Sequence, residues 1–565
     1  MCGIWACTGA KNTGLQDPKN CIEQLKARGP EDTRLVDLSG ITLGFTRLAI
    51  NGLNPHGMQP MTCQSGRIWW MCNGEIYNWR ALAFEHEIDV ASGSDCEVLG
   101  ALYTKIVLKE GASPASFFRM LDGVFAIVLV DTLLETVTVA RDPYGVRPLF
   151  VGQRWDFLMN SNSTNLMHQG YMFASEIKAL FPFSQSSTQF PPGTFATYSL
   201  HNHFLLTSGS FHTVQALKNP LFSEDGSLDM ACFALRTALE SAVKKRMMMA
   251  RPHPLPWRPV AALLSGGLDS SLIASLVAKE LRAAGRPQLK TFSIGMPGSE
   301  DLACARRVAE WIQSDHHEIV LSADEFFAAV PKVVYVTESF DTTTIRASVG
   351  NWLVARQVAK TECKVVFNGD GSDEVFGSYL YFNSAPHDSA YEEEVTRLLT
   401  EISHYDVLRS DRCISSHGLE PRTPFLDKQF VATARSMSTK WLRPFPGLKP
   451  EKWLLRRAFD DGETLPHSIL WRRKEAFSDG VSSQGKSWSE ILKEKTADCV
   501  PENWEVRAPL QYPTMTPTTT EQYFYRSLFE SNYGKANSFS VLQHFWMPKW
   551  SPGVTDPSAR VLHHY

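Results

Sequence analysis

The sequence predicts an α+β domain followed by an α/β domain, because its two parts differ in pattern. Before about residue 200, β-branched and apolar runs are punctuated by Gly, Pro and Asn, which is typical of antiparallel sheets. After residue 229, short apolar runs alternate with helical periodicity, which indicates a parallel sheet with helices on its faces. The 565 residues leave room for two or three domains with sizeable cores.

Strands in the first part are predicted from three runs of β-branched and apolar residues, at 41–50, 124–130 and 136–140. The following segment has weak periodicity and contains Ser-Gly-Ser, Asn-Pro and Asp-Gly, which are turn-forming sequences. We therefore predict a first domain at 2–205 and a linker at 206–228.

The second part begins with helical periodicity at 231–246. Strands are then predicted at 260–264, 290–295, 317–321 and 364–367, and helices between them at 270–284, 301–313 and 323–336. Residues beyond about 380 have mostly helical character, whereas the Pro- and Trp-rich end of the chain has no clear period. We predict an α/β domain at 229–500 and an extension at 501–565 that packs on it.

Composition indicates an ordinary soluble protein, with 43 % hydrophobic and 21 % charged residues. A net charge of -4 gives no electrostatic case for binding nucleic acid or an anionic membrane. No uncharged apolar run approaches the ~18–20 residues that span a bilayer, and residues 1–20 do not resemble a signal peptide. The eleven scattered cysteines favour a reducing compartment, so we expect a cytoplasmic protein.

Cys2, directly after the initiator methionine, is a candidate nucleophile. Its small side chain is compatible with removal of Met1, which would place the α-amine beside the thiol. An α-amine has a pKa of roughly 7.7–8.0, so it can serve as the base that activates its own side chain. Taken alone, a cysteine at this position favours the simpler interpretation of an ordinary buried cysteine.

Several segments behind Cys2 together resemble the class II glutamine amidotransferases, which are N-terminal-nucleophile glutaminases; these are 28–30 (Arg-Gly-Pro), Arg47, 73–78 (Asn-Gly-Glu-Ile-Tyr-Asn) and 94–97 (Ser-Asp-Cys-Glu). The resemblance implies an antiparallel β-sandwich flanked by helices. It also implies that Arg47 binds the α-carboxylate of glutamine and that Glu75 and Asp95 bind its α-ammonium. Asn73 and Gly74 would form the oxyanion hole.

This chain departs from the usual pattern of that family at two places. The family usually has His-Arg-Gly-Pro-Asp, where this chain has Ala27 and Glu31 at the two ends of the motif. It often has His or Glu before the carboxylate-binding arginine, where this chain has Thr46. None of these three is a residue to which we assign chemistry, so they bear on the rate of glutamine hydrolysis.

A phosphate-binding loop is predicted at 265–271, Ser-Gly-Gly-Leu-Asp-Ser-Ser, between an apolar strand and a helix. The glycines allow a tight turn with N–H groups facing an anion, and the helix N-terminus adds partial positive charge. The carboxylate of Asp269 would repel a bound phosphate unless a cation lay between the two, so we interpret Asp269 as a Mg²⁺ ligand. The loop is not of the Walker type; it resembles that of ATP pyrophosphatases. The alternative is a capped Gly-Gly turn.

A second acidic loop at 368–374, Asn-Gly-Asp-Gly-Ser-Asp-Glu, follows the strand predicted at 364–367. Ligand sites cluster at the carboxyl ends of parallel strands, so we predict that Asp373 is the second Mg²⁺ ligand. A glycine-rich turn with solvated acids is the alternative.

Further segments resemble the glutamine-hydrolysing asparagine synthetases, nearly end to end; they are 338–348, 406–412, 424–427, 451–452, 471–480 and, like animal-type members, 546–550 and 556–560. The resemblance implies a β-aspartyl-AMP intermediate, made from aspartate and ATP with release of pyrophosphate. Ammonia from glutamine would travel through an internal tunnel and attack it. A homodimer is also a family expectation.

The resemblance assigns further residues to the substrates. ATP would be bound by Leu264, Ser265, Gly266, Gly267, Asp269, Ser270, Ser271, Ile294, Asn368 and Gly369. Aspartate would be bound by Thr342, Thr343 and Arg346, and Lys452 would neutralise phosphate charge. The second loop departs from the usual Ser-Gly-Glu-Gly-Ser-Asp-Glu, with Asn368 for Ser and Asp370 for the catalytic Glu. The shorter acid lies about 1.5 Å further back, which predicts slower synthesis.

Two other functions stay open at this point. A related enzyme could adenylate a different carboxylate, although Cys2 argues against β-lactam synthetases, which usually lack it. Alternatively, the altered loops at 27–31 and 368–370 would suit a weakly active protein that binds glutamine or nucleotide as a sensor or scaffold.

Overall fold

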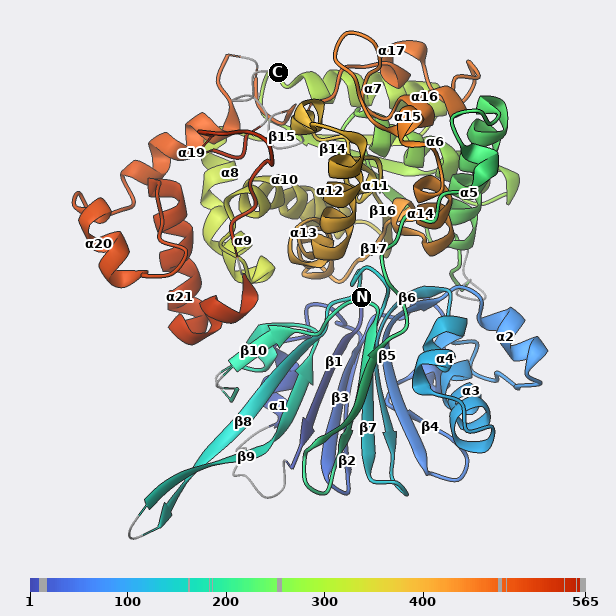
Figure 1. Ribbon diagram of the computed structural model, residues 1–565, viewed down its shortest axis with the longest axis vertical. Coiled ribbons are helices and arrows are strands. Elements are labelled where there is room, and N and C mark those ends of the chain that lie inside the picture. Colours follow the sequence, from blue (N-terminus) through green and yellow to red (C-terminus); the bar gives the residue numbers. More distant parts are fainter. Residues whose placement is uncertain are drawn as a thin grey trace.

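The computed structural model describes residues 1–9, 18–160, 163–181, 183–184, 186–250, 257–475, 480–483, 485–542, 544–554 and 556–558. Parts of the segments that carry the resemblance, at 476–479 and 559–560, lie outside these residues. Two bodies stacked along the long axis make up the molecule, with the strand-rich N-terminal half below the helix-rich C-terminal half (Figure 1).

The N-terminal half is a sandwich of two six-stranded antiparallel sheets, as predicted. One sheet has the order β10 (Ser186–Gln189), β8 (Phe150–Asn160), β9 (Ser163–Ala174), β1 (Gly3–Thr8), β3 (Ile41–Arg47) and β2 (Asp32–Leu38). The other has the order β12 (Leu205–Ser210), β11 (Thr194–Ser199), β7 (Thr136–Arg141), β6 (Gly123–Asp131), β5 (Ile68–Ile76) and β4 (Met61–Thr62). Alternate residues of both sheets, such as Ile4, Phe45 and Val128, share one core, which is the pattern of a two-sheet sandwich.

Helices cover the outer faces of this sandwich; they are α1 (Pro18–Glu23), α2 (Trp79–Glu85), α3 (Val98–Tyr103) and α4 (Pro114–Met120). The linker predicted at 206–228 begins too early, because β12 pairs with β11 at the edge of the second sheet. Most β12 residues are exposed, so its Thr-Ser-Gly-Ser sequence lacks the apolar alternation that reveals a half-buried strand.

The C-terminal half contains a five-stranded parallel sheet in the order β15 (Asp315–Val320), β14 (Lys290–Gly295), β13 (Ala261–Leu263), β16 (Val365–Phe367) and β17 (Glu420–Arg422). The four predicted strands are therefore confirmed, and β17 is an additional edge strand. Pro421 concealed it, because proline is tolerated in strands mainly at sheet edges.

Helices pack on both faces of this sheet (Figure 1). Between residues 228 and 470 the helices are α5 (Leu228–Lys245), α6 (Leu268–Ala283), α7 (Glu300–Ile312), α8 (Ala323–Ala328), α9 (Val330–Thr337), α10 (Thr342–Val358), α11 (Ser372–Phe376), α12 (Asp388–Glu401), α13 (Asp406–Ser415), α14 (Lys428–Arg435), α15 (Thr439–Leu442), α16 (Trp453–Ala458) and α17 (His467–Leu470). Of these, α6, α7, α10 and α13 contact strands of the sheet directly. The helix predicted at 323–336 is two helices, since Pro331 lies in the first turn of a new one.

Three more helices follow: α19 (Trp488–Ala497) lies before residue 501, whereas α20 (Trp504–Gln511) and α21 (Thr520–Val541) lie in the predicted extension. The 22-residue α21, kinked at Gly534, was not predicted, because no single apolar stripe runs along it. A weaker signal existed in the buried aromatics Tyr525, Phe529 and Tyr533, which recur every four residues. Among the described helices, none is long and apolar enough to cross a membrane.

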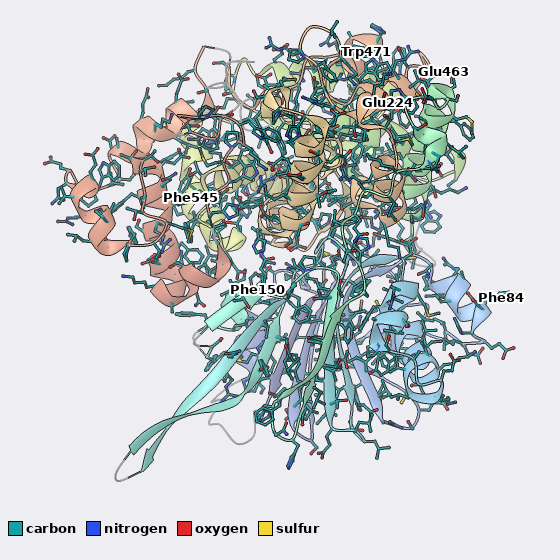
Figure 2. All side chains as sticks on the ribbon, viewed as in Figure 1. Phe84, Phe150, Glu224, Glu463, Trp471 and Phe545 are labelled. Atoms are coloured by element: carbon teal, nitrogen blue, oxygen red, sulfur yellow. The ribbon has the colours of Figure 1, made fainter. Side chains whose placement is uncertain are left out.

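The two halves meet around the N-terminus, which lies at the top of the sandwich (Figure 1). Phe150, labelled in Figure 2, lies at this junction, where the guanidinium of Arg412 stands 5.5 Å from its ring centroid. The buried Arg28 crosses the same junction and pairs with Asp411 at 2.8 Å. Both contacts connect the first domain to α13.

Candidate active sites

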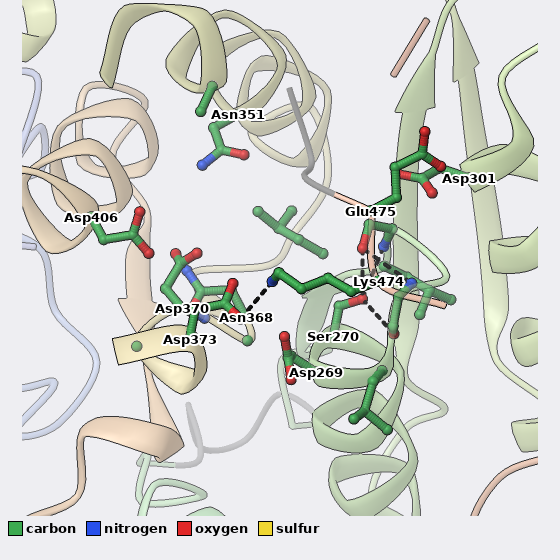
Figure 3. A pocket seen from close by; sticks show the side chains of 18 of the residues that line it. Asp269, Ser270, Asp301, Asn351, Asn368, Asp370, Asp373, Asp406, Lys474 and Glu475 are labelled. Carbon is green, nitrogen blue, oxygen red and sulfur yellow. Dashed lines mark hydrogen bonds and ion pairs between the residues drawn. The ribbon is translucent and has the colours of Figure 1, made fainter. Parts of the chain in front are cut away.

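A cavity of about 230 Å³ lies at the carboxyl ends of β13, β14 and β16 (Figure 3). The structure brings to it most of the residues predicted to bind ATP, metal or acceptor: Leu264, Ser265, Gly267, Asp269, Ser270, Ile294, Thr343, Asn368, Gly369, Asp370, Asp373 and Lys452. Ligands of open α/β sheets bind at this edge, so the fold places the cavity where the sequence predicted a site.

The first loop is held in shape by its own serines. Ser265 Oγ lies 2.9 Å from Ser270 Oγ, and the backbone N–H of Ser265 donates to Ser270 Oγ at 3.1 Å. Gly266 has a φ of +76°, which lets the chain turn before α6 begins. The second loop packs directly against it, because a Cβ on Gly369 would stand 2.8 Å from the backbone nitrogen of Ser270.

The carboxylates of both loops converge on one ammonium group. Lys452 Nζ lies 2.5 Å from Asp269 Oδ2 and 2.6 Å from Asp373 Oδ1, and Lys474 Nζ lies 2.5 Å from the same Asp373 oxygen. Burial alone would raise the pKa of Asp373, but the two lysines lower it well below its usual range. Burial likewise opposes the charge of Lys452, and the two carboxylates raise its pKa. Asp373 and Lys452 are therefore both charged at neutral pH.

This geometry suits a Mg²⁺ ion whose remaining ligands come from elsewhere. Asp269 and Asp373 already face a single cation between them. Within the described parts of the chain, no group of three or more His, Cys, Asp or Glu side chains is arranged to hold a metal. Mg²⁺ in phosphate sites is typically bound by one or two carboxylates together with waters and substrate phosphates, so the donor set fits.

Asp370 lies beside this cluster in a different environment. Its Oδ1 accepts from Arg409 at 3.1 Å, whereas its Oδ2 is buried without a partner among the described residues. Burial raises the pKa of Asp370, and the nearby Arg409 only partly opposes the shift. Its neighbour Asn368 donates to Ser410 at 2.7 Å, so both altered residues of the second loop contact α13.

Four predicted residues do not line the cavity. The hydroxyl of Ser271 is buried inside α6, and Gly266 packs against α7, where an added Cβ would lie 2.5 Å from the Ala305 nitrogen. Thr342 is buried outside the cavity, and Arg346 points away from it to pair with Glu521 and Asp556 at 2.6 and 2.8 Å. On α10, residues spaced four apart face the cavity, so Thr343 and Arg346 point in different directions.

A second cavity, of about 30 Å³, lies at the top of the sandwich. It is lined by Cys2, Arg47, Gly74, Glu75 and Asp95, five of the six residues predicted for glutamine hydrolysis. The Cys2 thiol is 3.5 Å from the backbone nitrogen of Leu48, and burial raises its pKa to about 11. The Met1 amine beside it is also buried, which lowers its pKa to about 5.

The polar groups of this cavity are already engaged. Arg47 donates to the carbonyl of Asn54 at 3.0 Å, and Asp95 accepts from the backbone N–H of Ile76 at 2.7 Å. Glu75 accepts from Asn51 at 2.6 Å and lies 3.5 Å from Arg422 of the other domain. The sixth predicted residue, Asn73, is buried next to them, with no partner for its amide atoms in the described structure.

Arg28 links this cavity to the second domain. Its Nε donates to the backbone carbonyl of Cys2 at 3.1 Å, while its other nitrogens bind Asp411 at 2.8 and 3.0 Å. Glu31, where the glutaminase family usually has Asp, accepts from the Ala49 backbone at 2.6 Å and pairs with Lys364. The unusual acid therefore makes contacts within and between the domains.

Comparison with known proteins gives matches for both halves of the chain. Residues 1–226 match the family model described as glutamine amidotransferase domain, and 234–398 and 383–554 match asparagine synthase. Asparagine synthetase [glutamine-hydrolyzing] of Mus musculus is 39 % identical and that of Homo sapiens 38 %, each covering 100 % of this chain and 99 % of the relative. The chain belongs to the glutamine-hydrolysing asparagine synthetase family.

Among solved structures, glutamine phosphoribosylpyrophosphate amidotransferase of B. subtilis aligns with 57 % of this chain and 91 % of its own, at 16 % identity. The TM-score of 0.31 is too low to bear on the reaction. The family membership therefore depends on the sequence matches.

The larger cavity is also lined by residues to which the sequence analysis assigned no role: Asp301, Asn351, Tyr379, Asp406, Arg409, Arg472 and Lys474. A signal existed for some of them. Asp406 and Arg409 are spaced three apart on α13, as ion-paired residues on one helix face are, and they lie 2.7 Å apart. Asn351 gave no signal, since a single amide in a helix has no pattern.

Proposed function

We propose that this chain makes asparagine from aspartate, ATP and glutamine, with release of AMP, pyrophosphate and glutamate. The observation that carries the proposal is the convergence of Asp269, Asp373 and Lys452 on one point between two phosphate-type loops. The identity of the substrates is inferred from the family, and the cavity at Cys2 is the proposed site of glutamine hydrolysis.

In the larger cavity, we infer that the triphosphate lies over the first loop. Ser265, Gly267 and Ser270 face it at the N-terminus of α6, which favours an anion. Asp269 and Asp373 would hold Mg²⁺, which neutralises phosphate charge when bound. Lys452 and Lys474 are placed to stabilise the charge that develops on pyrophosphate as it leaves.

The acceptor carboxylate would lie on the α10 and α13 side of the cavity. Thr343, Asn351, Asp370 and Arg409 face this side, and Arg409 is the cation nearest to Asp370. The β-carboxylate of aspartate attacks the α-phosphorus to give β-aspartyl-AMP and pyrophosphate. Ammonia then attacks the acyl carbon, and AMP leaves. The raised pKa of Asp370 suits a group that takes up a proton during ammonia attack.

In the smaller cavity, Cys2 would attack the amide of glutamine after Met1 is removed. The new α-amine would take the thiol proton, and Asn73 and Gly74 would donate to the oxyanion. The unpaired amide of Asn73 supports this role, because a buried polar group without a partner costs free energy unless a ligand satisfies it. Arg47 and Asp95 would bind the amino-acid end of the substrate.

The proposal is tested by measuring asparagine and pyrophosphate from aspartate and Mg·ATP, with glutamine or ammonium as the nitrogen source. We expect asparagine from both. Asparagine from ammonium alone would place the defect in Cys2 processing, and glutamate without asparagine would indicate another acceptor. No turnover with any substrate would favour a binding protein. The homodimer, the cytoplasmic location and the absence of nucleic-acid binding stay predictions.

Asp370 is tested separately, by Asp370→Ala. Asparagine formation should fall by about 10²-fold or more, because the variant lacks the only carboxylate that we place beside the acyl group. Glutamine hydrolysis should persist. Asp370→Glu tests whether the surroundings of this residue, including Arg409, are adapted to the shorter acid. A large rise in the rate of asparagine formation would mean that they are not.

A further inference from the structure

The C-terminal tail, meaning described residues 544–554 and 556–558, lies against the outer side of the larger cavity. Its Asp556 forms a two-pronged ion pair with Arg346 of α10, at 2.8 and 3.0 Å. Glu521 of α21 binds the remaining edge of the same guanidinium at 2.9 and 2.6 Å. Arg346 is buried, and these two carboxylates accept from four of its five N–H donors; it does not line the cavity itself.

The tail also binds the beginning of α10. Asp341 caps this helix, its Oδ2 accepting from the backbone N–H of Thr344 at 2.8 Å. Its Oδ1 accepts from the backbone N–H of Trp546 at 2.8 Å. Phe545, labelled in Figure 2, packs edge-on against Phe340, with ring centroids 5.9 Å apart. Two separate points on the tail therefore hold the first turns of α10.

A third contact reaches the cavity wall directly. The indole of Trp546 packs on Tyr379, with ring centroids 5.4 Å apart, and Tyr379 lines the cavity. The next tryptophan, Trp550, packs instead on Tyr381 and Phe382, which do not line it. In addition, Tyr405, just before α13, donates its hydroxyl to the carbonyl of His544 at 3.0 Å.

We propose that the tail is a positioning element of the synthetase site, and that Asp556 and Trp546 act through α10 and Tyr379. The inference rests on the proposed function. One face of α10 presents Thr343, Ala347 and Asn351 to the cavity. The tail binds the same helix on another side, through Arg346 and Asp341. A helix moves as a rigid unit, so a shift of Arg346 or Asp341 moves the acceptor-facing side chains with it.

The tail should therefore affect the acceptor more than the nucleotide. The first phosphate loop is held by contacts within 265–270 and by Lys452, and no described hydrogen bond or ion pair joins the tail to either. The tail approaches the second loop only through Tyr379, whose hydroxyl donates to Glu374. A misplacement near 1 Å can cost on the order of 10²-fold, so a smaller shift should raise the KM for aspartate by about 10-fold. The KM for ATP and the rate of glutamine hydrolysis should change by less than about 2-fold.

The test compares two variants with two matched controls in the full-length chain. Asp556→Asn removes the charge that holds Arg346, whereas Lys493→Met removes the other partner of Asp556, 2.8 Å away on α19, without touching α10. Trp546→Ala removes the contact with Tyr379, whereas Trp550→Ala removes a tail tryptophan that does not touch it. KM and kcat for aspartate, ATP and glutamine are measured for each.

A selective rise in the aspartate KM for Asp556→Asn and Trp546→Ala, with both controls close to the unmodified chain, would support the proposal. Unchanged aspartate kinetics in both variants would overturn it. Equal losses in all four variants, for every substrate, would also overturn it, because they would indicate only general stabilisation. If the unmodified chain makes no asparagine from ammonium, the proposed function has failed rather than the tail.

Discussion

The two cavities of this molecule hold their charged groups in opposite ways. In the larger one, Asp269, Asp373 and Lys452 pair with one another inside a single domain. In the smaller one, the charged groups bind backbone atoms or the other domain, as Glu75 does with Arg422. The larger cavity can therefore exchange its internal ion pairs for a multiply charged substrate, whereas the smaller one is shaped in advance for one small molecule.

This difference implies an asymmetry between the half-reactions. The lysine–aspartate cluster does not use any residue of the first domain, so we expect it to work without glutamine hydrolysis. The carbonyl of Cys2, by contrast, is bound by Arg28, which Asp411 of the second domain holds. Glutamine hydrolysis should therefore depend on the synthetase domain more than synthesis depends on the glutaminase domain.

The largest expected effect comes from Cys2→Ala. Loss of the nucleophile should reduce glutamine hydrolysis by about 10³-fold or more, and asparagine formation from ammonium should stay within about 2-fold. Glutamate release and asparagine formation are assayed side by side. Cys63→Ala, a cysteine far along the chain outside either cavity, is the control. Retained hydrolysis in Cys2→Ala would mean that another group is the nucleophile.

Lys452→Met tests the larger cavity. Without its ammonium, two carboxylates face each other and the departing pyrophosphate loses a cation, so pyrophosphate release should fall by about 10²-fold. Glutamine hydrolysis should be unaffected. Lys440→Met, an exposed lysine on α15, should have no effect on either reaction. Equal loss of both activities would show that the half-reactions are not separable in the way proposed.

The sequence predicted the chemistry of the sites better than the directions in which side chains point. Glycine-rich turns after apolar strands locate a phosphate site, because backbone geometry and strand order decide its place. Whether a helical residue faces the cavity depends on packing from distant segments. Arg346 turns outward because Glu521 and Asp556, more than 170 positions away, bind it there. No local pattern contains that information.

The fold shows the same limit. The parallel strand β14 was predicted closely, because all its residues except Lys290 are small or apolar and buried. The edge strands β12 and β17 were missed, since an edge strand is defined by pairing on one side and requires no apolar period. The single helix predicted at 323–336 is two helices, because Pro331 lies in the first turn of α9.

A moderate effect is expected from Arg422→Met, which breaks the contact between the domains at Glu75. Arg422 also pairs with the buried Glu420 at 2.9 Å, and breaking a buried ion pair typically costs about 3–5 kcal/mol, so thermal stability should fall as well. The KM for glutamine should rise by about 10-fold, while synthesis from ammonium should change by less than about 3-fold. A larger loss of ammonium-dependent synthesis than of hydrolysis would contradict the asymmetry.

The smallest effect is a pH dependence confined to the smaller cavity. Burial raises the pKa of Asp95 from 3.8 to about 6, so its carboxylate is about nine-tenths ionised at pH 7 and about one-quarter ionised at pH 5.5. If the carboxylate binds the α-ammonium of glutamine, the ratio of kcat/KM for hydrolysis between the unmodified chain and Asp95→Asn should fall by about 4-fold over that range, because the α-amine of Cys2 titrates in both. Asp95→Asn should be weaker at pH 7 and should lose this step in the profile.

The same group should act on stability in the opposite direction. Between pH 3.8 and about 6 the folded chain binds this proton and the unfolded chain does not, so the contribution of Asp95 to stability is present at low pH and is lost as the pH rises through 6. The melting temperature of the unmodified chain relative to Asp95→Asn should therefore be higher at pH 5 than at pH 7, while glutamine use declines. No difference from Asp95→Asn in the pH dependence of either quantity would mean that Asp95 stays ionised throughout, and that its hydrogen bond from Ile76 outweighs burial.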